Sequence, residues 1–204
     1  MKVLYFGGAF NPPTKAHIAL ADHARKQLGF DKVLFMPTKY EYVRYDEGKD
    51  FVYSDDRRLE MLQRIAPHHD WMIVSDYEMK QPFQPRTYHT MKYLSGMYTL
   101  KLLIGSDWLK KLETGWNYIP EICREFGIAV MARNGDNVQK MIAQDAYLSS
   151  LEPYLTIVEV PSEWQGASST AIRQAVMKIR EAEEYLRQAL PEEISEEDLK
   201  PGDE

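Results

Sequence analysis

The chain has 204 residues, 44% of them hydrophobic, and its formal net charge at pH 7 is −6. This length and composition are typical of one folded domain and argue against a disordered chain. No stretch approaches the roughly 20 apolar residues of a membrane span, and Met1–Phe6 is followed too soon by glycine for a secretory signal. One cysteine, Cys123, permits no internal disulfide, so we expect a reducing cytoplasm.

The negative charge is concentrated at one end of the chain. Residues 191–204 contain seven acidic residues and one lysine, whereas the remainder carries equal numbers of acidic and basic residues. We therefore expect a folded domain over residues 1–190 and a solvated acidic tail over residues 191–204. The balanced charge of the folded part argues against a nucleic-acid partner.

Short apolar runs recur along the chain and predict buried strands. Several of them stop at a glycine or a proline, namely Gly7, Pro37 and Gly105. The expected strands are Lys2–Phe6, Lys32–Met36, Trp71–Val74, Thr99–Ile104, Gly127–Met131 and Leu155–Val160.

Helical patterns separate these strands. Gly29 is placed to end the first helix and Ser54 to cap the second. Residues 39–53 are polar and aromatic without a clear period, so they predict a long loop, and residues 81–86 predict a shorter one. The expected helices are about 13–28, 54–66, 87–94, 106–126, 137–149 and 168–190.

The order of these elements predicts the class of fold. Strands alternate with helices, and each strand is a continuous apolar run rather than an alternating one. This pattern is typical of an α/β protein, a Rossmann-like doubly wound parallel sheet with helices on both faces. Such sheets bind ligands at the carboxyl ends of their strands, near a switch in strand order.

The stretch YFGGAFNPPTKAH, between the first strand and the first helix, has the residues of a phosphate site. Gly7 and Gly8 allow close approach of the backbone, and the helix behind them directs its N–H groups towards an anion. Thr14 and His17 lie three residues apart, so they share one face of the first turn. An ordinary strand–turn–helix, in which His17 only caps or packs, would show the same residues.

This stretch resembles the signature of the nucleotidyltransferase superfamily, Gly-Gly-(Ser/Thr)-Phe-(Asp/Asn)-Pro-x-(His/Thr)-x-x-His. Thr14 stands where the usual bacterial form has its first histidine. A Thr-x-x-His form is familiar from eukaryotic members that adenylylate pyridine mononucleotides. The resemblance implies that ATP is bound by the motif's glycines, backbone and histidine, that is, by Gly7, Gly8, Ala9, Phe10 and His17.

A second stretch, ASSTAIR, resembles the superfamily's Ile-Ser-Ser-Thr-x-Ile-Arg. Its hydroxyl side chains can cap a helix start, and Arg173, one turn later, can form a bidentate contact with phosphate oxygens. A plain helix cap is the simpler interpretation of the hydroxyls alone. The resemblance implies that ATP is held by Ser168, Ser169, Thr170 and Arg173.

Two further stretches resemble the mononucleotide adenylyltransferases within that superfamily. IGSDWLKKLETGW resembles their Gly-x-Asp followed by a tryptophan, and MARNG resembles their Arg-Pro-Gly. The resemblance implies that Gly105 and Asp107 contact ATP, that Trp116 lies against a pyridine ring, and that Arg133 contacts the phosphate of the mononucleotide. Without that context, Trp116 would be read as a core residue and Arg133 as a surface residue.

The stretch PRTYHTM departs from the family pattern Ser-Tyr-Thr-x-Asp-Thr-Leu, because His89 replaces the acid. The resemblance places Thr87 and His89 beside the mononucleotide. The same stretch supplies Arg86, Thr87, Tyr88 and His89. The change from the acid to His89 makes the local field less negative, which favours a carboxylate over an amide on the pyridine ring. We therefore predict nicotinate mononucleotide as the preferred substrate, with nicotinamide mononucleotide as the alternative.

The implied reaction joins the mononucleotide phosphate to the α-phosphorus of ATP, in NAD biosynthesis. His17, Thr14 and Arg173 are the candidate catalytic residues, with Mg²⁺ arriving on the triphosphate. No zinc site is expected at His68 and His69, which have no partner at ligand spacing. The alternatives are transfer to pantetheine phosphate, transfer of a cytidylyl group, or nucleotide binding with little catalysis.

Overall fold

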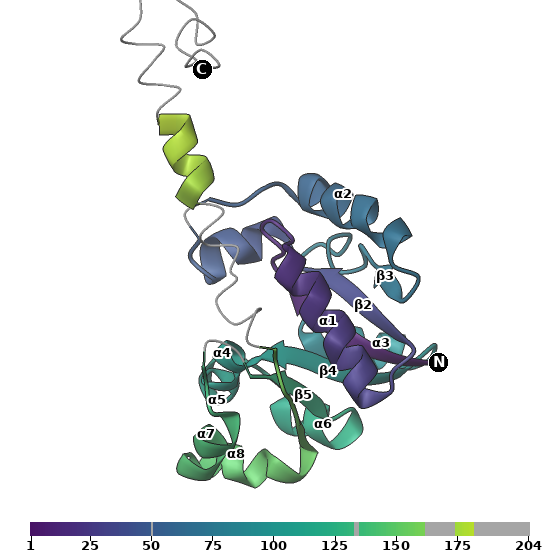
Figure 1. Cartoon of the computed structure of the whole chain (residues 1–204), viewed down its shortest axis with the longest axis vertical. Coiled ribbons are helices and arrows are strands. Elements are labelled where there is room, and N and C mark those ends of the chain that lie inside the picture. The colour runs from purple at the N-terminus through teal and green to yellow at the C-terminus, as the bar shows by residue number, and fades with distance from the viewer. Residues whose placement is uncertain (50, 133–134, 162–173, 182–204) are drawn as a thin grey trace, which may run out of the picture.

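A parallel sheet of six strands forms the centre of the computed structural model (Figure 1), in the order β3-β2-β1-β4-β5-β6. This order confirms the predicted doubly wound α/β fold, with the switch in direction between β1 and β4. The structure describes residues 1–49, 51–132, 135–161 and 174–181. The strands are β1 (Lys2–Gly8), β2 (Lys32–Pro37), β3 (Met72–Val74), β4 (Thr99–Gly105), β5 (Ile128–Met131) and β6 (Leu155–Val158).

Both faces of the sheet are buried, as the apolar runs predict. In β1, Val3 and Tyr5 point into one hydrophobic core, whereas Leu4 and Phe6 point into the other. Successive strand residues face opposite sides, so a strand covered on both faces needs apolar residues at every position. Because helices cover both faces, the carboxyl ends of the strands are the part of the sheet left for ligand binding.

Helices pack on each face of this sheet (Figure 1). α1 and α2 contribute to the core that contains Leu4, and α3 to α8 contribute to the core that contains Tyr5. The helices are α1 (Lys15–Leu28), α2 (Asp55–Ile65), α3 (Thr87–Leu94), α4 (Ser106–Leu109), α5 (Leu112–Gly115), α6 (Ile119–Glu125), α7 (Val138–Gln144) and α8 (Ala146–Leu151). Two short 3₁₀ turns lie at Ala66–His68 and Glu152–Tyr154.

The ends of the first two helices follow from their capping residues. Gly29 ends α1 in the left-handed conformation, with φ at 65°, and its N–H bonds back to Arg25 and Lys26. Ser54 caps α2 by accepting a hydrogen bond from the N–H of Arg57. Both caps are confirmed where the sequence places them.

Three segments differ from the sequence prediction. The expected loop 39–53 contains a π-helical turn, Tyr42–Asp46, anchored by the fully buried Val43. The expected helix 106–126 is three short helices, with a break where Tyr118 has φ at 65°. The expected helix 137–149 is divided into two helices, α7 and α8. Asp145 has an extended backbone that ends α7, and its side chain caps α8 by accepting a hydrogen bond from the N–H of Leu148 at 2.9 Å.

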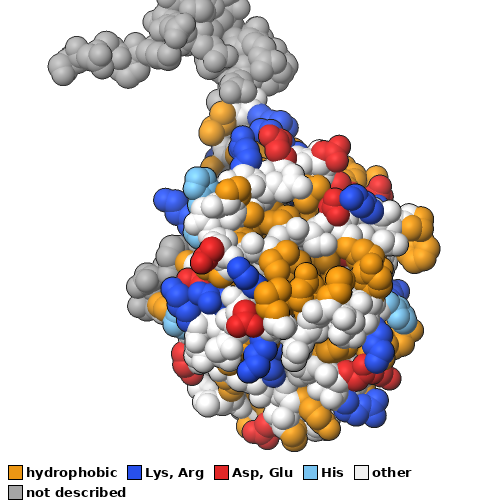
Figure 2. Space-filling view, turned by 90° about the vertical axis from the view of Figure 1, so that its right-hand side faces the viewer, with side chains coloured by type: hydrophobic (Ala, Val, Ile, Leu, Met, Phe, Trp, Pro, Cys, Tyr) orange, Lys and Arg blue, Asp and Glu red, His pale blue; other side chains and the backbone are white. Residues whose placement is uncertain are grey.

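Residues 174–181 are helical, in agreement with part of the helix expected at residues 168–190. The predicted domain boundary at residue 190 and the acidic tail lie outside the described residues. On the face shown in Figure 2, positive and negative side chains are interspersed. No helix in the described part of the chain is long and apolar enough to cross a membrane.

Candidate active site

The predicted phosphate loop lies at the switch point of the sheet. β1 ends at Gly8 and β4 ends at Gly105, and the two strands are hydrogen-bonded neighbours. α1 then packs on one face of the sheet and α4 on the other. A ligand bound here therefore meets elements from both halves of the fold.

The backbone turns sharply after β1. Phe10 has φ at 42°, and its ring is buried with 2% of its surface exposed. A Cβ on Gly7 would lie only 3.1 Å from Cε1 of Tyr5, so any larger residue there would have to displace the buried Tyr5 ring slightly. Gly7, Gly8 and Ala9 stay partly exposed. The main chain of the loop is accessible while the Phe10 ring anchors it.

Thr14 and His17 form a reciprocal capping box at the start of α1. The N–H of His17 donates to Oγ1 of Thr14 at 3.2 Å, and the N–H of Thr14 donates to Nδ1 of His17 at 3.0 Å. Since Nδ1 accepts a backbone proton, a neutral ring carries its own proton on Nε2. The local fold thus fixes both the direction and the tautomer of the candidate catalytic histidine.

Aromatic contacts hold the same imidazole from the side. The ring of Phe10 meets His17 edge to face, with centroids 5.3 Å apart and planes at 77°, and Phe6 lies 6.3 Å away. The sequence predicts that Thr14 and His17 share one face of the helix, and the structure brings them into direct contact. Thr14 therefore orients His17 as well as presenting a hydroxyl.

Arg58 of α2 ties the phosphate loop to the rest of the site. Its side chain is fully buried and donates to the carbonyl oxygens of Ala9 and Thr38, each at 2.6 Å, and of Tyr53 at 3.1 Å. Asp55, one turn earlier on α2, supplies the counter-charge. Burial lowers the pKa of Arg58 and Asp55 opposes that shift. The ends of β1 and β2 are thus joined through one guanidinium.

The sequence prediction did not include Arg58 or Asn11. Arg58 lies four residues before the buried Leu62, on the inward face of α2, and that spacing was the available signal. Asn11 is 1% exposed; its Nδ2 donates to the carbonyl of Phe51 at 2.7 Å and its Oδ1 accepts from the N–H of Tyr53 at 2.9 Å. The asparagine of the first motif therefore fixes the end of the 39–53 segment.

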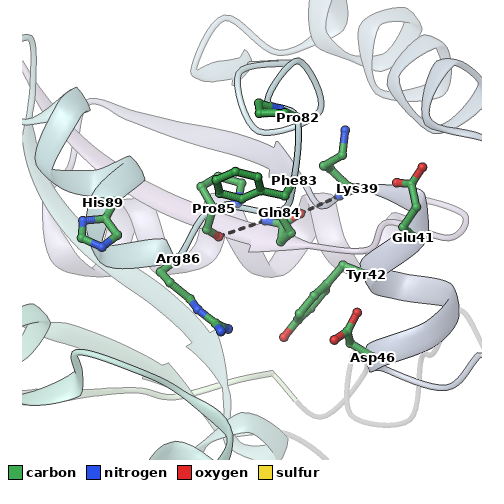
Figure 3. Close-up of a pocket in the computed structure, with 10 residues that line it drawn as sticks. All are labelled: Lys39, Glu41, Tyr42, Asp46, Pro82, Phe83, Gln84, Pro85, Arg86 and His89. Carbon is green, nitrogen blue, oxygen red and sulfur yellow. Dashed lines mark hydrogen bonds between the residues drawn. The ribbon is translucent and has the colours of Figure 1, made fainter.

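A pocket of about 740 Å³ lies between that segment and the start of α3 (Figure 3). One wall comes from the residues after β2, and the other comes from the 82–86 loop and the first turn of α3. It includes His89, one of the residues expected beside a mononucleotide. The lining residues are Lys39, Glu41, Tyr42, Asp46, Pro82, Phe83, Gln84, Pro85, Arg86 and His89.

Gln84 joins the two walls of this pocket. Its Oε1 accepts from the N–H of Lys39 at 2.8 Å, and its Nε2 donates to Oε2 of Glu78 at 2.6 Å. Nζ of Lys39 also donates a hydrogen bond to the carbonyl oxygen of Met79, at 2.9 Å. Both walls are therefore fixed relative to each other by hydrogen bonds between segments about 40 residues apart in sequence.

Glu78 is the buried acid behind the pocket. It is 2% exposed, and its Oε1 accepts from the hydroxyls of Tyr5 at 2.6 Å and Thr90 at 2.8 Å. Burial raises the pKa of Glu78, although these hydrogen bonds and the one from Gln84 oppose the shift. No local sequence pattern marks Glu78, because its partners come from β1 and α3.

The end of β4 carries a second polar cluster. Ser106, fully buried, donates to Oδ2 of Asp136 at 2.8 Å, and Nζ of Lys110 lies 3.1 Å from Oδ1. These two hydrogen bonds lower the pKa of Asp136. Gly105 is buried at the strand end and Asp107 is exposed on the first turn of α4. Both predicted ATP contacts in this motif therefore lie at the switch point.

The residues expected beside the pyridine ring come from α3 and from the segment before α6. Thr87 begins α3 and is partly buried. His89 is exposed and meets the ring of Tyr118 edge to face at 4.9 Å. Trp116 is partly buried against Trp108, with centroids 5.7 Å apart. The His89–Tyr118 contact brings the two predicted segments side by side.

The remaining predicted residues lie outside the described part of the chain. They are Arg133, Ser168, Ser169, Thr170 and Arg173. Within residues 1–49, 51–132, 135–161 and 174–181, no three His, Cys, Asp or Glu side chains come together as a metal-binding group.

The strand order and the phosphate loop at its switch point define a class of protein, and sequence comparison agrees with them. The cytidylyltransferase-like family matches residues 5–175. The chain therefore belongs to this family, and it is a nucleotidyltransferase.

Its curated relatives place it more narrowly. A protein of Exiguobacterium sibiricum is 28% identical over 197 residues, covering 95% of this chain and 94% of the relative. One from Endomicrobium trichonymphae is 31% identical over 179 residues, covering 86% of each. Both are named probable nicotinate-nucleotide adenylyltransferase. The chain groups with these enzymes within the family, as its motifs predict.

Solved structures agree at the level of the fold. The nicotinic acid mononucleotide adenylyltransferase of Plasmodium falciparum, complexed with NaAD, superposes with a TM-score of 0.67. It is 19% identical, and the match covers 85% of this chain and 82% of that one. The doubly wound architecture is thus shared with this solved enzyme.

Proposed function

We propose that the protein joins ATP and nicotinate mononucleotide to give deamido-NAD and pyrophosphate, a step of NAD biosynthesis in the cytoplasm. The observation that carries this proposal is the capping box that aims His17 from the first turn of α1, directly behind the glycines that end β1. The names of the relatives support adenylyl transfer to nicotinate mononucleotide.

The chemistry needs alignment rather than an activated nucleophile. A phosphate monoester has its second pKa near 6, so the attacking oxygen is already largely ionised at neutral pH. That oxygen forms a bond to the α-phosphorus of ATP, and the bond from this phosphorus to the bridging oxygen breaks. Pyrophosphate leaves with the bonding electron pair, so no side chain has to accept a proton.

His17 stabilises the charge that develops in this step. Because Nδ1 accepts from Thr14, Nε2 is the ring nitrogen that bears the proton and can donate to a phosphate oxygen. The backbone of Gly8, Ala9 and Phe10 lines the proposed phosphate site, and the N-terminal N–H groups of α1 add further donors to the phosphate. Thr14 keeps the imidazole in its orientation and adds a hydroxyl.

Other roles follow the family resemblance. Ser168, Ser169, Thr170 and Arg173 bind the β- and γ-phosphates, together with Gly105 and Asp107 at the end of β4. Trp116 stacks on the pyridine ring beside Thr87 and His89, and Arg133 binds the phosphate of the mononucleotide. In this proposal ATP occupies the switch point and the mononucleotide lies on the side of α3.

Mg²⁺ is the metal we propose for the reaction, because it prefers phosphate and water oxygens and neutralises the triphosphate. The acid at the β4–β5 edge, Asp136, is already bonded to Ser106 and Lys110. We therefore propose that the metal is held mostly by the triphosphate and its waters.

The test is a direct assay of the protein with ATP, Mg²⁺ and each mononucleotide, measuring pyrophosphate and dinucleotide. We expect the parent to form deamido-NAD from nicotinate mononucleotide. His17→Ala should lower kcat by a factor on the order of 10²–10³, the usual effect of removing one transition-state donor, whereas the loss of its half of the capping box should cost only about 1 kcal/mol of stability. A kcat within threefold of the parent at saturating substrates would remove His17 from the mechanism.

A further inference from the structure

Arg86 is a cation in the pocket that forms no ion pair with any described residue. It lies directly before α3, its side chain is exposed, and it lines the 740 Å³ pocket (Figure 3). Among the residues that the structure describes, it forms no ion pair and its guanidinium forms no hydrogen bond, although Glu41 and Asp46 line the same pocket. A guanidinium in this position is ready to bind an anion.

The pocket is joined to the phosphate loop by the backbone. Thr38 donates its N–H to the carbonyl of Gly8 at 3.0 Å, and the next residue, Lys39, begins the pocket wall. Arg58 holds Ala9 and Thr38 together from behind. A ligand whose phosphate lies at the loop can therefore extend its other end into this pocket.

Tyr42 adds a second donor on the opposite wall. In Figure 3 its hydroxyl and the guanidinium of Arg86 point towards the same open space. Burial and the charges of Glu47 and Asp46 raise the pKa of Tyr42, and the positive charge of Arg86 partly opposes that shift. The phenol is therefore a neutral donor next to a fixed cation.

This pair of donors distinguishes the two pyridine substituents. A carboxylate accepts hydrogen bonds at both oxygens, and a guanidinium matches it in a bidentate contact. A carboxamide presents an NH₂ group that has no acceptor on Arg86. The remaining cation of the pocket, Lys39, donates its ammonium to the carbonyl of Met79, so Arg86 is the group placed to make this distinction.

We propose that Arg86, assisted by the hydroxyl of Tyr42, selects a mononucleotide whose pyridine ring carries a carboxylate over one that carries a carboxamide. The proposal rests on the adenylyltransferase function proposed above and adds the residue that determines its specificity. Arg86 acts on the bound ring and not on the phosphates, so it governs choice of substrate rather than the rate of adenylyl transfer.

The test compares kcat/KM for nicotinate and nicotinamide mononucleotide in the parent, Arg86→Gln and Tyr42→Phe. Arg86→Gln should lower kcat/KM for the nicotinate substrate on the order of 10–100-fold, the effect of one or two charge-assisted hydrogen bonds. The value for the nicotinamide substrate should stay within threefold. Tyr42→Phe should shift the same ratio in the same direction by less.

Arg57→Gln is the matched control, because it removes the same charge from an exposed position on α2 that is paired with Glu60. It should leave the ratio unchanged. If Arg86→Gln leaves the ratio within threefold of the parent, or lowers both substrates equally, the assignment is overturned while the adenylyltransferase function stands. If the parent forms no dinucleotide from either mononucleotide, the function and the assignment both fail.

Discussion

The phosphate loop after β1 and the pocket beside α3 are built in different ways. In the loop, Thr14 and His17 contact each other within one helical turn, and Phe10 packs on the same imidazole. In the pocket, Gln84 accepts a hydrogen bond from the N–H of Lys39, and Glu78 accepts one from the hydroxyl of Tyr5. Local contacts fix the residues that we propose for the chemistry, and contacts across the fold form the pocket that we propose for the ring.

Arg58 is the residue that joins these two regions, and its loss should have the largest effect. Arg58→Met removes the donor to three carbonyl oxygens and the cation that pairs with Asp55. We expect the free energy of unfolding to fall by about 3–5 kcal/mol, as for one partner of a buried ion pair. Urea unfolding measures it, with Arg57→Met, on the exposed side of α2, as the control. A loss of under 1 kcal/mol would mean that the two regions are held together by other contacts.

A change at Glu78 tests the pocket without changing the phosphate loop. Glu78→Gln turns an NH₂ group towards Nε2 of Gln84 or towards the hydroxyls of Tyr5 and Thr90, so we expect a loss of about 1–3 kcal/mol. The pKa of Glu78 is raised in the folded state, so the folded protein holds this proton more tightly than the unfolded chain. The parent's stability relative to the variant should therefore be greatest at acid pH. It should decrease as pH rises from the ordinary carboxyl range through the raised pKa.

Urea unfolding of both proteins between pH 4 and 8 measures this difference. A difference in stability that stays constant over the range would contradict a raised pKa at Glu78. Activity separates the regions further, because the variant should alter KM for the mononucleotide more than kcat.

A change at Thr14 tests the phosphate loop without changing the pocket, and it should have the smallest effect on stability. Thr14→Ala removes the helix cap at a cost of about 1 kcal/mol. It also removes the hydroxyl that lies 3.0 Å from Nδ1 of His17, although the backbone N–H of residue 14 still donates to that nitrogen. The imidazole is then held less firmly, so we expect kcat to fall about 5- to 10-fold, a change of about 1 kcal/mol in the barrier. Thr14→Ser keeps the hydroxyl and should restore both quantities. A variant that loses stability but keeps the parent's kcat would reduce Thr14 to a structural cap.

The same contrast explains what could be predicted from the sequence. The strands, the caps at Gly29 and Ser54, and the position of His17 follow from patterns within one element, and the structure agrees with each. Arg58 carried a weaker signal, its spacing from Leu62. Glu78, Gln84 and the π-helical turn around Val43 depend on partners far away in the chain, and no periodicity in one segment indicates them.

The central claim is that the phosphate loop provides the chemistry while the pocket selects the ring. It is tested most directly by measuring kcat/KM of His17→Ala for nicotinate and nicotinamide mononucleotide in one assay. We predict that both values fall by a factor on the order of 10²–10³, while their ratio stays within threefold of the parent's. A ratio that changes as much as it does in Arg86→Gln would contradict the separation of the two regions.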